Sequence, residues 1–291
     1  MLGYRHSFHA GNPADVLKHA VLIYCLEYCL KKEKPVLCVD THAGAGVYTI
    51  KKNLSREWEN GVGKLPAYAG TSTAVPASVS GYLKRLTDAM IYNGSPLLMA
   101  KLLRMQDRLV CFELHPKDFA ELNENIKSFR AAAGESVDHA KIPKIEVRQE
   151  DGPLMLKSLL PPPSGRGLIF IDPAWEEKDE YEIVPLHTAA ALKRFPQGLY
   201  VIWYPLLKKP KTVLSNSIGK TLLELYEGNR CRLELFNPAA EISENSPRGM
   251  HGSGLVIYNP PWTLKQELGD LLPFLAEVLM NGGEWNLEWK E

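Results

Sequence analysis

A glycine-bearing turn follows a buried strand-like run near the start of the chain. The run PVLCVD ends at Asp40, and the turn THAGAG behind it contains Gly44 and Gly46, which let the backbone pass close to a ligand. The spacing is not the G-x-G-x-x-G of a dinucleotide site, and such a turn can also be a simple tight loop. It therefore indicates a ligand site only if other parts of the chain bring suitable side chains to it.

Three later strand-like runs each end in an acidic residue. Glu113 follows LVCF, Asp151 follows KIEVRQE, and Asp172 follows GLIFI. In a parallel sheet the carboxyl ends of all strands lie on one edge, so these carboxylates would converge with the glycine turn on one crevice. Each acid alone could be a helix cap or a turn residue. Their repetition in strand order favours a binding site.

The segment DPAW, from Asp172 to Trp175, resembles the D/N-P-P-Y/F/W motif of amino-methyltransferases, which methylate the exocyclic nitrogen of adenine or related amine and amide nitrogens. An aromatic amine donates its lone pair into the ring and is a poor nucleophile. The Asp172 carboxylate and the main-chain carbonyl of Pro173 would accept its two hydrogens and direct the lone pair toward the methyl donor. Trp175 would stack on the base after it is flipped out.

Two features complicate this assignment. Ala174 replaces the second proline of the motif, which loosens the turn without removing either acceptor. A closer match in letters, NPPW, runs from Asn259 to Trp262 behind the run GLVIY. We expect that last strand to run antiparallel to its neighbours, so its carboxyl end emerges at the edge opposite the glycine turn. NPPW is therefore predicted to be structural.

The segment YRHSFHAGNPADVLKH is unusually polar for the entry to a helix, with these side chains close together: Tyr4, His6, His9, Lys18 and His19. The histidines and Asp15 could serve as metal ligands. However, His6 and His9 lie in an irregular segment, and no cysteine is nearby to complete a site. Methyl transfer from a sulfonium also needs no metal, so we predict that no metal is bound here. The remaining alternative is that these residues cap and pack the helix.

The elements that must position these residues follow from the pattern of apolar runs. Asn12 as a cap, Pro13 in the first turn and Asp15 near the positive end predict a helix from about Pro13 to Leu30. Apolar strands then alternate with helix-length segments, which favours a mostly parallel α/β sheet covered on both faces. The Gly-, Ser- and Pro-rich stretch at about 51–94 is interpreted as a helical insertion within a single domain spanning residues 1–291.

Composition sets the remaining bounds. With 291 residues, of which 45% are hydrophobic and 23% charged, the chain can bury one large core. No long apolar run and no secretion signal are present, which predicts a cytoplasmic protein without a membrane partner. The formal net charge is zero, so the composition by itself does not indicate binding to nucleic acid. The basic run LLKKPK could contact phosphate or be a solvated loop.

Taken together, the motifs resemble those of the bacterial RlmJ family of 23S ribosomal RNA adenine-N6 methyltransferases. The resemblance rests on YRHSFHAGNPADVLKH, VDTHAGAG, GSP, FELHP, EDG, IDPAW, RGM and NPPW, which span nearly the whole chain in order. The chain departs from the family pattern at Ala174, at Trp175, where tyrosine is common, and at Pro13, where histidine is usual.

The resemblance implies a Rossmann-like class I methyltransferase with a mostly parallel seven-stranded sheet, acting as a monomer on protein-free 23S rRNA. It implies S-adenosylmethionine as the methyl donor, with these contacts: His19, His42, Gly44, Ser95, Glu113, Asp151, Gly152 and Asp172. Tyr4, His6 and Lys18 would lie near the substrate base. The positions of Glu113 and Asp151 agree with the strand-end argument, whereas spacing alone does not single out His42 or Ser95.

Two other functional classes remain open at the level of sequence. The chain could be a methyltransferase for DNA adenine or for a glutamine amide, which share the same motif. It could also be a non-catalytic RNA-binding relative that keeps the fold, for which the altered DPAW is the one indication.

Overall fold

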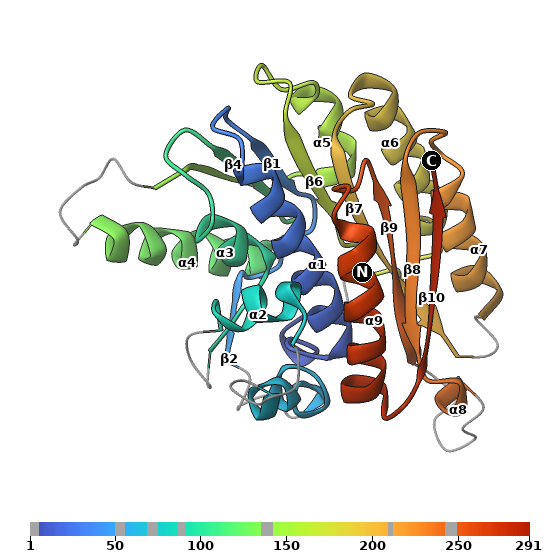
Figure 1. Ribbon diagram of the computed structural model, residues 1–291. Coiled ribbons are helices and arrows are strands. Elements are labelled where there is room, and N and C mark those ends of the chain that lie inside the picture. The colour runs from blue at the N-terminus through green and yellow to red at the C-terminus, as the bar shows by residue number, and fades with distance from the viewer. Residues whose placement is uncertain are drawn as a thin grey trace.

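Eight strands form one mixed sheet in the order β10-β8-β9-β7-β6-β1-β4-β5 in the computed structural model (Figure 1). The structure describes residues 6–49, 56–68, 75–86, 91–134, 142–208, 212–241 and 249–291. The strands are β1 (Leu37–Asp40), β4 (Arg108–Phe112), β5 (Lys144–Arg148), β6 (Gly167–Ile171), β7 (Leu199–Leu207), β8 (Arg230–Phe236), β9 (Met250–Tyr258) and β10 (Glu284–Lys290).

The direction of the strands confirms the mostly parallel sheet. Strands β5, β4, β1, β6 and β7 are mutually parallel. Strand β9 is antiparallel to both β7 and β8, as expected for the run GLVIY. The carboxyl ends of the five parallel strands therefore share one edge, and the acids at the ends of four of them are brought together.

The expected count of seven strands is wrong, because β10 adds an eighth at the edge, antiparallel to β8. Its sequence EWNLEWK is rich in charge, and its first three residues are exposed. Main-chain pairing with β8 holds this strand, and Leu287 and Trp289 on its apolar face are only partly buried against the core. The alternation of Trp285, Leu287 and Trp289 was the signal for it.

Helices cover both faces of the sheet. Helices α1, α3 and α9 lie on one face, and α5, α6 and α7 lie on the other (Figure 1). The helices are α1 (Pro13–Leu30), α2 (Ala77–Leu83), α3 (Ser95–Ala100), α4 (Pro116–Gly134), α5 (Gly152–Leu159), α6 (Glu180–Arg194), α7 (Thr212–Leu223), α8 (Pro238–Glu241) and α9 (Leu264–Met280). Within the described ranges, none combines the length and apolar character that crossing a bilayer requires.

Helix α1 forms as predicted and lies deep in the molecule. The Asn12 side chain accepts a hydrogen bond from the Asp15 amide at 3.0 Å, and Pro13 occupies the first turn. Residues 14 to 23 of this helix are all buried, which is typical of a helix surrounded by other elements. Polar residues on its first turns are therefore placed inside the protein and require partners there.

The segment predicted as an insertion starts and ends on a two-stranded ribbon. Strand β2 (Val47–Thr49) pairs with β3 (Ile91–Asn93) in antiparallel register. Between them the structure describes the 3-10 helices η3 (Glu57–Asn60) and η4 (Val62–Tyr68) and helix α2, and residues 50–55, 69–74 and 87–90 lie outside the described ranges. The interpretation of about 51–94 as an inserted helical subdomain within a single domain spanning residues 1–291 stays a prediction.

The NPPW motif lies at the opposite edge from the strand-end acids, as predicted. Strand β9 ends at Tyr258, which pairs with Tyr200 at the start of β7. The next residue, Asn259, has a φ of 53°. Its side-chain Nδ2 donates to the main-chain carbonyls of Pro196 at 2.7 Å and Gly198 at 2.6 Å. Its side-chain Oδ1 accepts a hydrogen bond from the Tyr226 hydroxyl. Asn259 is thus explained by structure alone.

We predict that Asn259→Ala lowers the free energy of unfolding by about 2–3 kcal/mol, because it removes these hydrogen bonds and places alanine at positive φ. Asn281, with the same φ of 53°, is the matched control. Its replacement by alanine should cost about 1 kcal/mol, since the hydrogen bond that its Oδ1 accepts from Lys64 is exposed and the backbone conformation is the main loss. Urea denaturation measures both, and equal losses would contradict the role given to the Asn259 side chain.

Candidate active site

A cavity of about 350 Å³ opens at the shared carboxyl edge of β1, β4, β5 and β6. It brings together most of the residues singled out in the sequence: His6, Lys18, His19, His42, Gly44, Ser95, Glu113, Asp151, Gly152, Asp172 and Pro173 all line it. Two predicted residues are not among them. Tyr4 lies outside the described residues, and Trp175 is buried elsewhere.

The glycine turn and Glu113 hold one another in place. Gly44 has a φ of 59°, and a Cβ atom there would lie 2.2 Å from the Tyr48 hydroxyl oxygen, so only glycine fits. Its amide donates to Glu113 Oε2 at 2.8 Å, and the His115 amide donates to Oε1 at 2.7 Å. Burial raises the pKa of Glu113, and the two amides oppose this rise. The carboxylate is thereby fixed at the cavity wall.

Asp151 and Gly152 form the turn between β5 and α5. Asp151 caps the helix, since its Oδ1 accepts from the Leu154 amide at 3.0 Å. A Cβ atom on Gly152 would lie 2.2 Å from the Thr41 carbonyl oxygen, so glycine is required for this turn to approach the end of β1. The helix-cap interpretation of Asp151 is therefore correct in addition to its place at the cavity.

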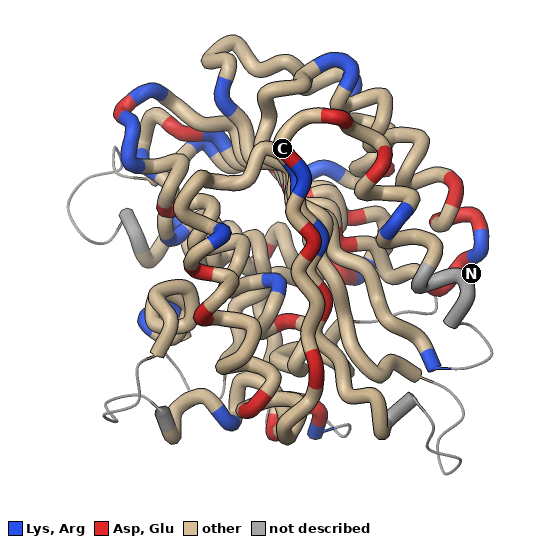
Figure 2. The backbone as a smooth tube through the Cα atoms, turned by 45° about the vertical axis from the view of Figure 1, so that its right-hand side comes forward, with Lys and Arg blue, Asp and Glu red and all other residues tan. Residues whose placement is uncertain are grey.

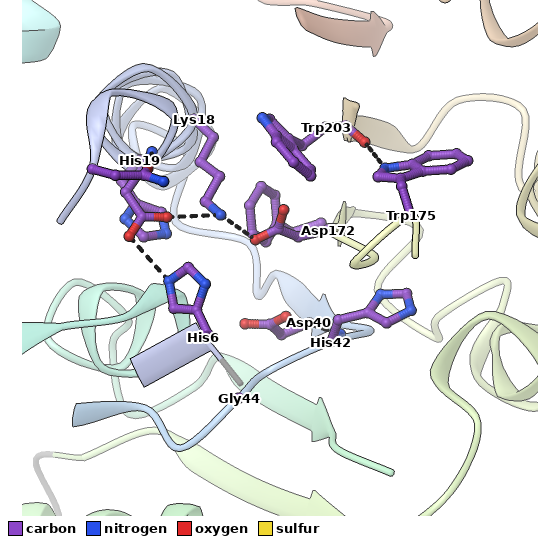
Figure 3. A network of polar contacts seen from close by, with 12 residues as sticks. His6, Lys18, His19, Asp40, His42, Gly44, Asp172, Trp175 and Trp203 are labelled. Carbon is purple, nitrogen blue, oxygen red and sulfur yellow. Dashed lines mark hydrogen bonds and ion pairs between the residues drawn. The ribbon is translucent and has the colours of Figure 1, made fainter. Parts of the chain in front are cut away.

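A buried ion network joins α1 to the end of β6. Lys18 Nζ lies 2.8 Å from Asp15 Oδ1 and 2.7 Å from Asp172 Oδ2, and His6 Nε2 lies 3.0 Å from Asp15 Oδ2 (Figure 3). Burial alone would lower the pKa of Lys18, but the two carboxylates raise it above its ordinary value. Burial would likewise raise the pKa of Asp15, yet His6 and Lys18 hold it well below the usual range.

The pKa of Asp172 is shifted in the opposite direction to that of Asp15. Burial raises the pKa of its carboxyl group, and the Lys18 ammonium limits the rise. Asp172 is followed by Pro173, which also lines the cavity. The DPAW turn therefore presents a largely buried carboxylate whose orientation is set by a cation on a helix.

Two histidines at the site are neutral. Burial lowers the pKa of His19 to about 3 and that of His42 to about 4. His19 Nδ1 lies 2.6 Å from the Tyr92 hydroxyl, which accepts from Tyr82, so His19 belongs to a buried hydrogen-bond chain. His42 Nδ1 is 2.8 Å from the Thr41 hydroxyl. Both can offer uncharged ring nitrogens to a ligand.

One residue that lines the cavity and one buried residue next to it were not singled out as contacts by sequence reasoning. Asp40 is fully buried beneath the glycine turn, and burial raises its pKa to about 7 against an opposing hydrogen bond from Ser95. Trp203 in β7 lines the cavity, with Lys18 Nζ 5.1 Å from its ring centroid. The signal for Trp203 was available, since β7 ends on the same edge as β6.

Trp175 is oriented differently from the expected base-stacking platform. It is 4% exposed, has a φ of 55°, and donates from Nε1 to the Trp203 carbonyl at 2.9 Å (Figure 3). Its ring lies 5.0 Å from that of Tyr181. In this structure Trp175 packs the DPAW turn against β7, and Trp203 and Tyr48 are aromatic residues that line the cavity.

The N-terminal histidines are engaged in pairs within the protein. His9 Nδ1 lies 3.0 Å from Glu57, which ties the N-terminal segment to η3. Over the residues that the structure describes, no group of three or more His, Cys, Asp or Glu side chains is arranged to hold a metal ion.

This strand order, with one antiparallel strand between two parallel ones and acids along the carboxyl edge, defines a Rossmann-like methyltransferase fold. Residues 33–291 match the family described as "Ribosomal RNA large subunit methyltransferase D, RlmJ". The chain belongs to this family.

Similar proteins agree along nearly the whole chain. A Haemophilus influenzae protein named Ribosomal RNA large subunit methyltransferase J is 36% identical over 99% of both chains. An Escherichia coli protein of the same name is 37% identical over 97% of this chain and 96% of its own. A crystal structure of a Legionella pneumophila protein superposes with a TM-score of 0.81 at 31% identity, covering 97% of this chain and 99% of that one.

We predict that Lys18→Met lowers the free energy of unfolding by about 3–5 kcal/mol at neutral pH, because two buried carboxylates lose their cation. Their pKa values in the folded variant then lie above those in the unfolded chain. The deficit relative to the wild type should shrink as the pH falls through these raised values, where the carboxylates become protonated.

The matched control for this prediction is Lys127→Met. Lys127 makes an exposed ion pair with Glu124 at 2.7 Å. Such surface pairs contribute about 0–1 kcal/mol. Chemical denaturation at several pH values measures both variants, and a pH-independent or equally small loss for Lys18→Met would show that the buried network is not coupled as described.

Proposed function

We propose that this protein transfers a methyl group from S-adenosylmethionine to the exocyclic N6 of an adenine in 23S ribosomal RNA. The observation that carries the proposal is the largely buried Asp172 carboxylate beside Pro173, aligned by Lys18 at the wall of the cavity. The names of the relatives support ribosomal RNA as the substrate class.

The cavity fits the expected methyl donor. Its volume of about 350 Å³ lies within the usual range for small-molecule sites. Glu113, fixed by two amides, would accept hydrogen bonds from the ribose hydroxyls, and Asp151, which lines the same cavity, would meet the adenine of the cofactor. Gly44 lets a ligand approach the backbone. When bound, S-adenosylmethionine supplies an electrophilic methyl group on a sulfonium.

Asp172 and Pro173 would polarise the acceptor amine. The carboxylate accepts one N6 hydrogen and the Pro173 carbonyl accepts the other, which localises the nitrogen lone pair. The same carboxylate stabilises the positive charge that develops on N6, and its raised pKa suits it to take the proton that leaves. Lys18 keeps the carboxylate in position throughout.

The substrate base must leave its stack to reach this cavity. His6 and Lys18 are proposed to lie beside the flipped base, together with Tyr4, and Trp203 offers it an apolar surface. We further propose, from the family resemblance, that the enzyme is a cytoplasmic monomer that acts on protein-free 23S rRNA. Positioning and amine polarisation would account for most of the rate acceleration.

Labelled methyl groups from S-adenosylmethionine should appear as N6-methyladenosine in unmodified 23S rRNA, measured by nucleoside analysis. Asp172→Ala should lower kcat by about 10²–10⁴, because the carboxylate that accepts the amine hydrogen is lost. Binding of S-adenosylmethionine to the variant, measured by calorimetry, should persist through Glu113 and Asp151. Replacement of the exposed Asp270 by alanine is the control and should leave kcat unchanged.

Other results would change the assignment in defined ways. Methyl transfer to duplex DNA or to a glutamine-containing peptide, without transfer to 23S rRNA, would refute the proposed acceptor. Cofactor binding without transfer to any acceptor would point to the DPAW turn, and Ala174→Pro would then test whether the missing proline is the cause.

A further inference from the structure

A second cavity, of about 430 Å³, lies at the opposite edge of the sheet, where β6 and β7 begin. Residues from the end of α1, the turn before β6 and the segment after β9 line it, including Tyr28, Lys31, Lys32, Arg166, Asn259 and Trp262. None of its described lining residues is an aspartate or a glutamate. It is therefore a hollow of positive and aromatic character.

Trp262, the last residue of NPPW, is not explained by packing. It is 78% exposed, the largest fraction among the exposed large hydrophobic residues of the described chain. Asn259 locks the turn to the start of β7, and Pro260 and Pro261 are buried with restricted backbone angles. The indole is thus presented to solvent on a rigid support, which lowers the entropy lost when a flat ligand stacks on it.

The cations beside Trp262 also rest on a fixed backbone. Arg104 donates to the carbonyls of Leu30 and Lys32, and Arg166 donates to those of Cys29 and Lys34. These bonds hold the turn at residues 31–34, whose side chains are all exposed. This turn carries Lys31, Lys32 and Lys34 and one acid, Glu33, so its net charge is positive.

We propose that this second cavity binds a single-stranded stretch of the RNA substrate, with a base stacked on Trp262 and the adjacent phosphates neutralised by Lys31 and Lys32. The inference rests on the proposed function for its RNA. Lys and Arg are interspersed with Asp and Glu along the backbone (Figure 2), so a neutral chain must bind RNA through local patches. An aromatic platform beside cations is the usual chemistry of single-strand binding.

The position of this second RNA site determines what it can affect. Strand β6 starts at Gly167 beside the second cavity and ends next to Asp172 at the first. An RNA bound at both edges must extend across the molecule beyond the methylated nucleotide. Removal of the second site therefore raises KM for long RNA and leaves kcat unchanged, and methylation of the shortest RNA substrate should be insensitive to it.

The test uses the full-length protein and a fluorescently labelled single-stranded RNA of about twelve nucleotides, read by anisotropy. Trp262→Ala should weaken binding by about five- to hundredfold, because the base can no longer stack on the indole. The double substitution of Lys31 and Lys32 by alanine should flatten the salt dependence, with a slope change of about 0.7 for each phosphate that is no longer neutralised. In methylation assays on 23S rRNA, both variants should raise KM without lowering kcat.

Trp285→Ala is the matched control, because Trp285 is also an exposed tryptophan, 40% accessible, on strand β10 away from this cavity. It should leave RNA affinity unchanged. The second RNA site is refuted if Trp262→Ala also leaves RNA affinity and KM unchanged while the wild type methylates 23S rRNA. The proposed function then stands, and this conclusion is the same if the face binds a protein. If the wild type binds the oligonucleotide through Trp262 but does not methylate 23S rRNA, the proposed function fails and the RNA site stands.

Discussion

The ion network of Asp15, Lys18 and Asp172 is the interaction on which the rest of the site depends. Lys18 belongs to a helix surrounded by protein, so its ammonium is stable there only because two carboxylates face it. One of them is on the same helix and the other follows β6. The network therefore fixes the helix, the strand end and the N-terminal His6 relative to one another, so the geometry of the candidate site depends on the packing of the core.

Much of this arrangement could be predicted from the sequence, because it depends on local patterns. The acids Glu113, Asp151 and Asp172 follow apolar runs, and parallel strands bring such ends to one edge. The start of α1 was readable from Asn12 and Pro13. The same reasoning placed NPPW at the opposite edge, since it follows an antiparallel strand.

The features that the sequence did not reveal depend on tertiary contacts. The orientation of Trp175 follows from a hydrogen bond to the Trp203 carbonyl, which no spacing within DPAW encodes. The raised pKa of Asp40 comes from complete burial, and burial is a property of the assembled sheet. Strand β10 has little buried surface, so its pairing with β8 carried a weak apolar signal.

The β2–β3 ribbon has a consequence for how this enzyme can vary. The two strands pair in register as a separate two-stranded sheet, so the chain enters and leaves the stretch between them at almost the same point. Because closing a longer loop costs only slightly more entropy, surface positions between them can gain or lose residues while the sheet keeps its register, whereas Leu65, Val79 and Tyr82 are buried in the core and constrain the rest. The ribbon therefore sets a boundary in the chain: changes of length between its two strands leave the main sheet and the residues at its carboxyl edge in place.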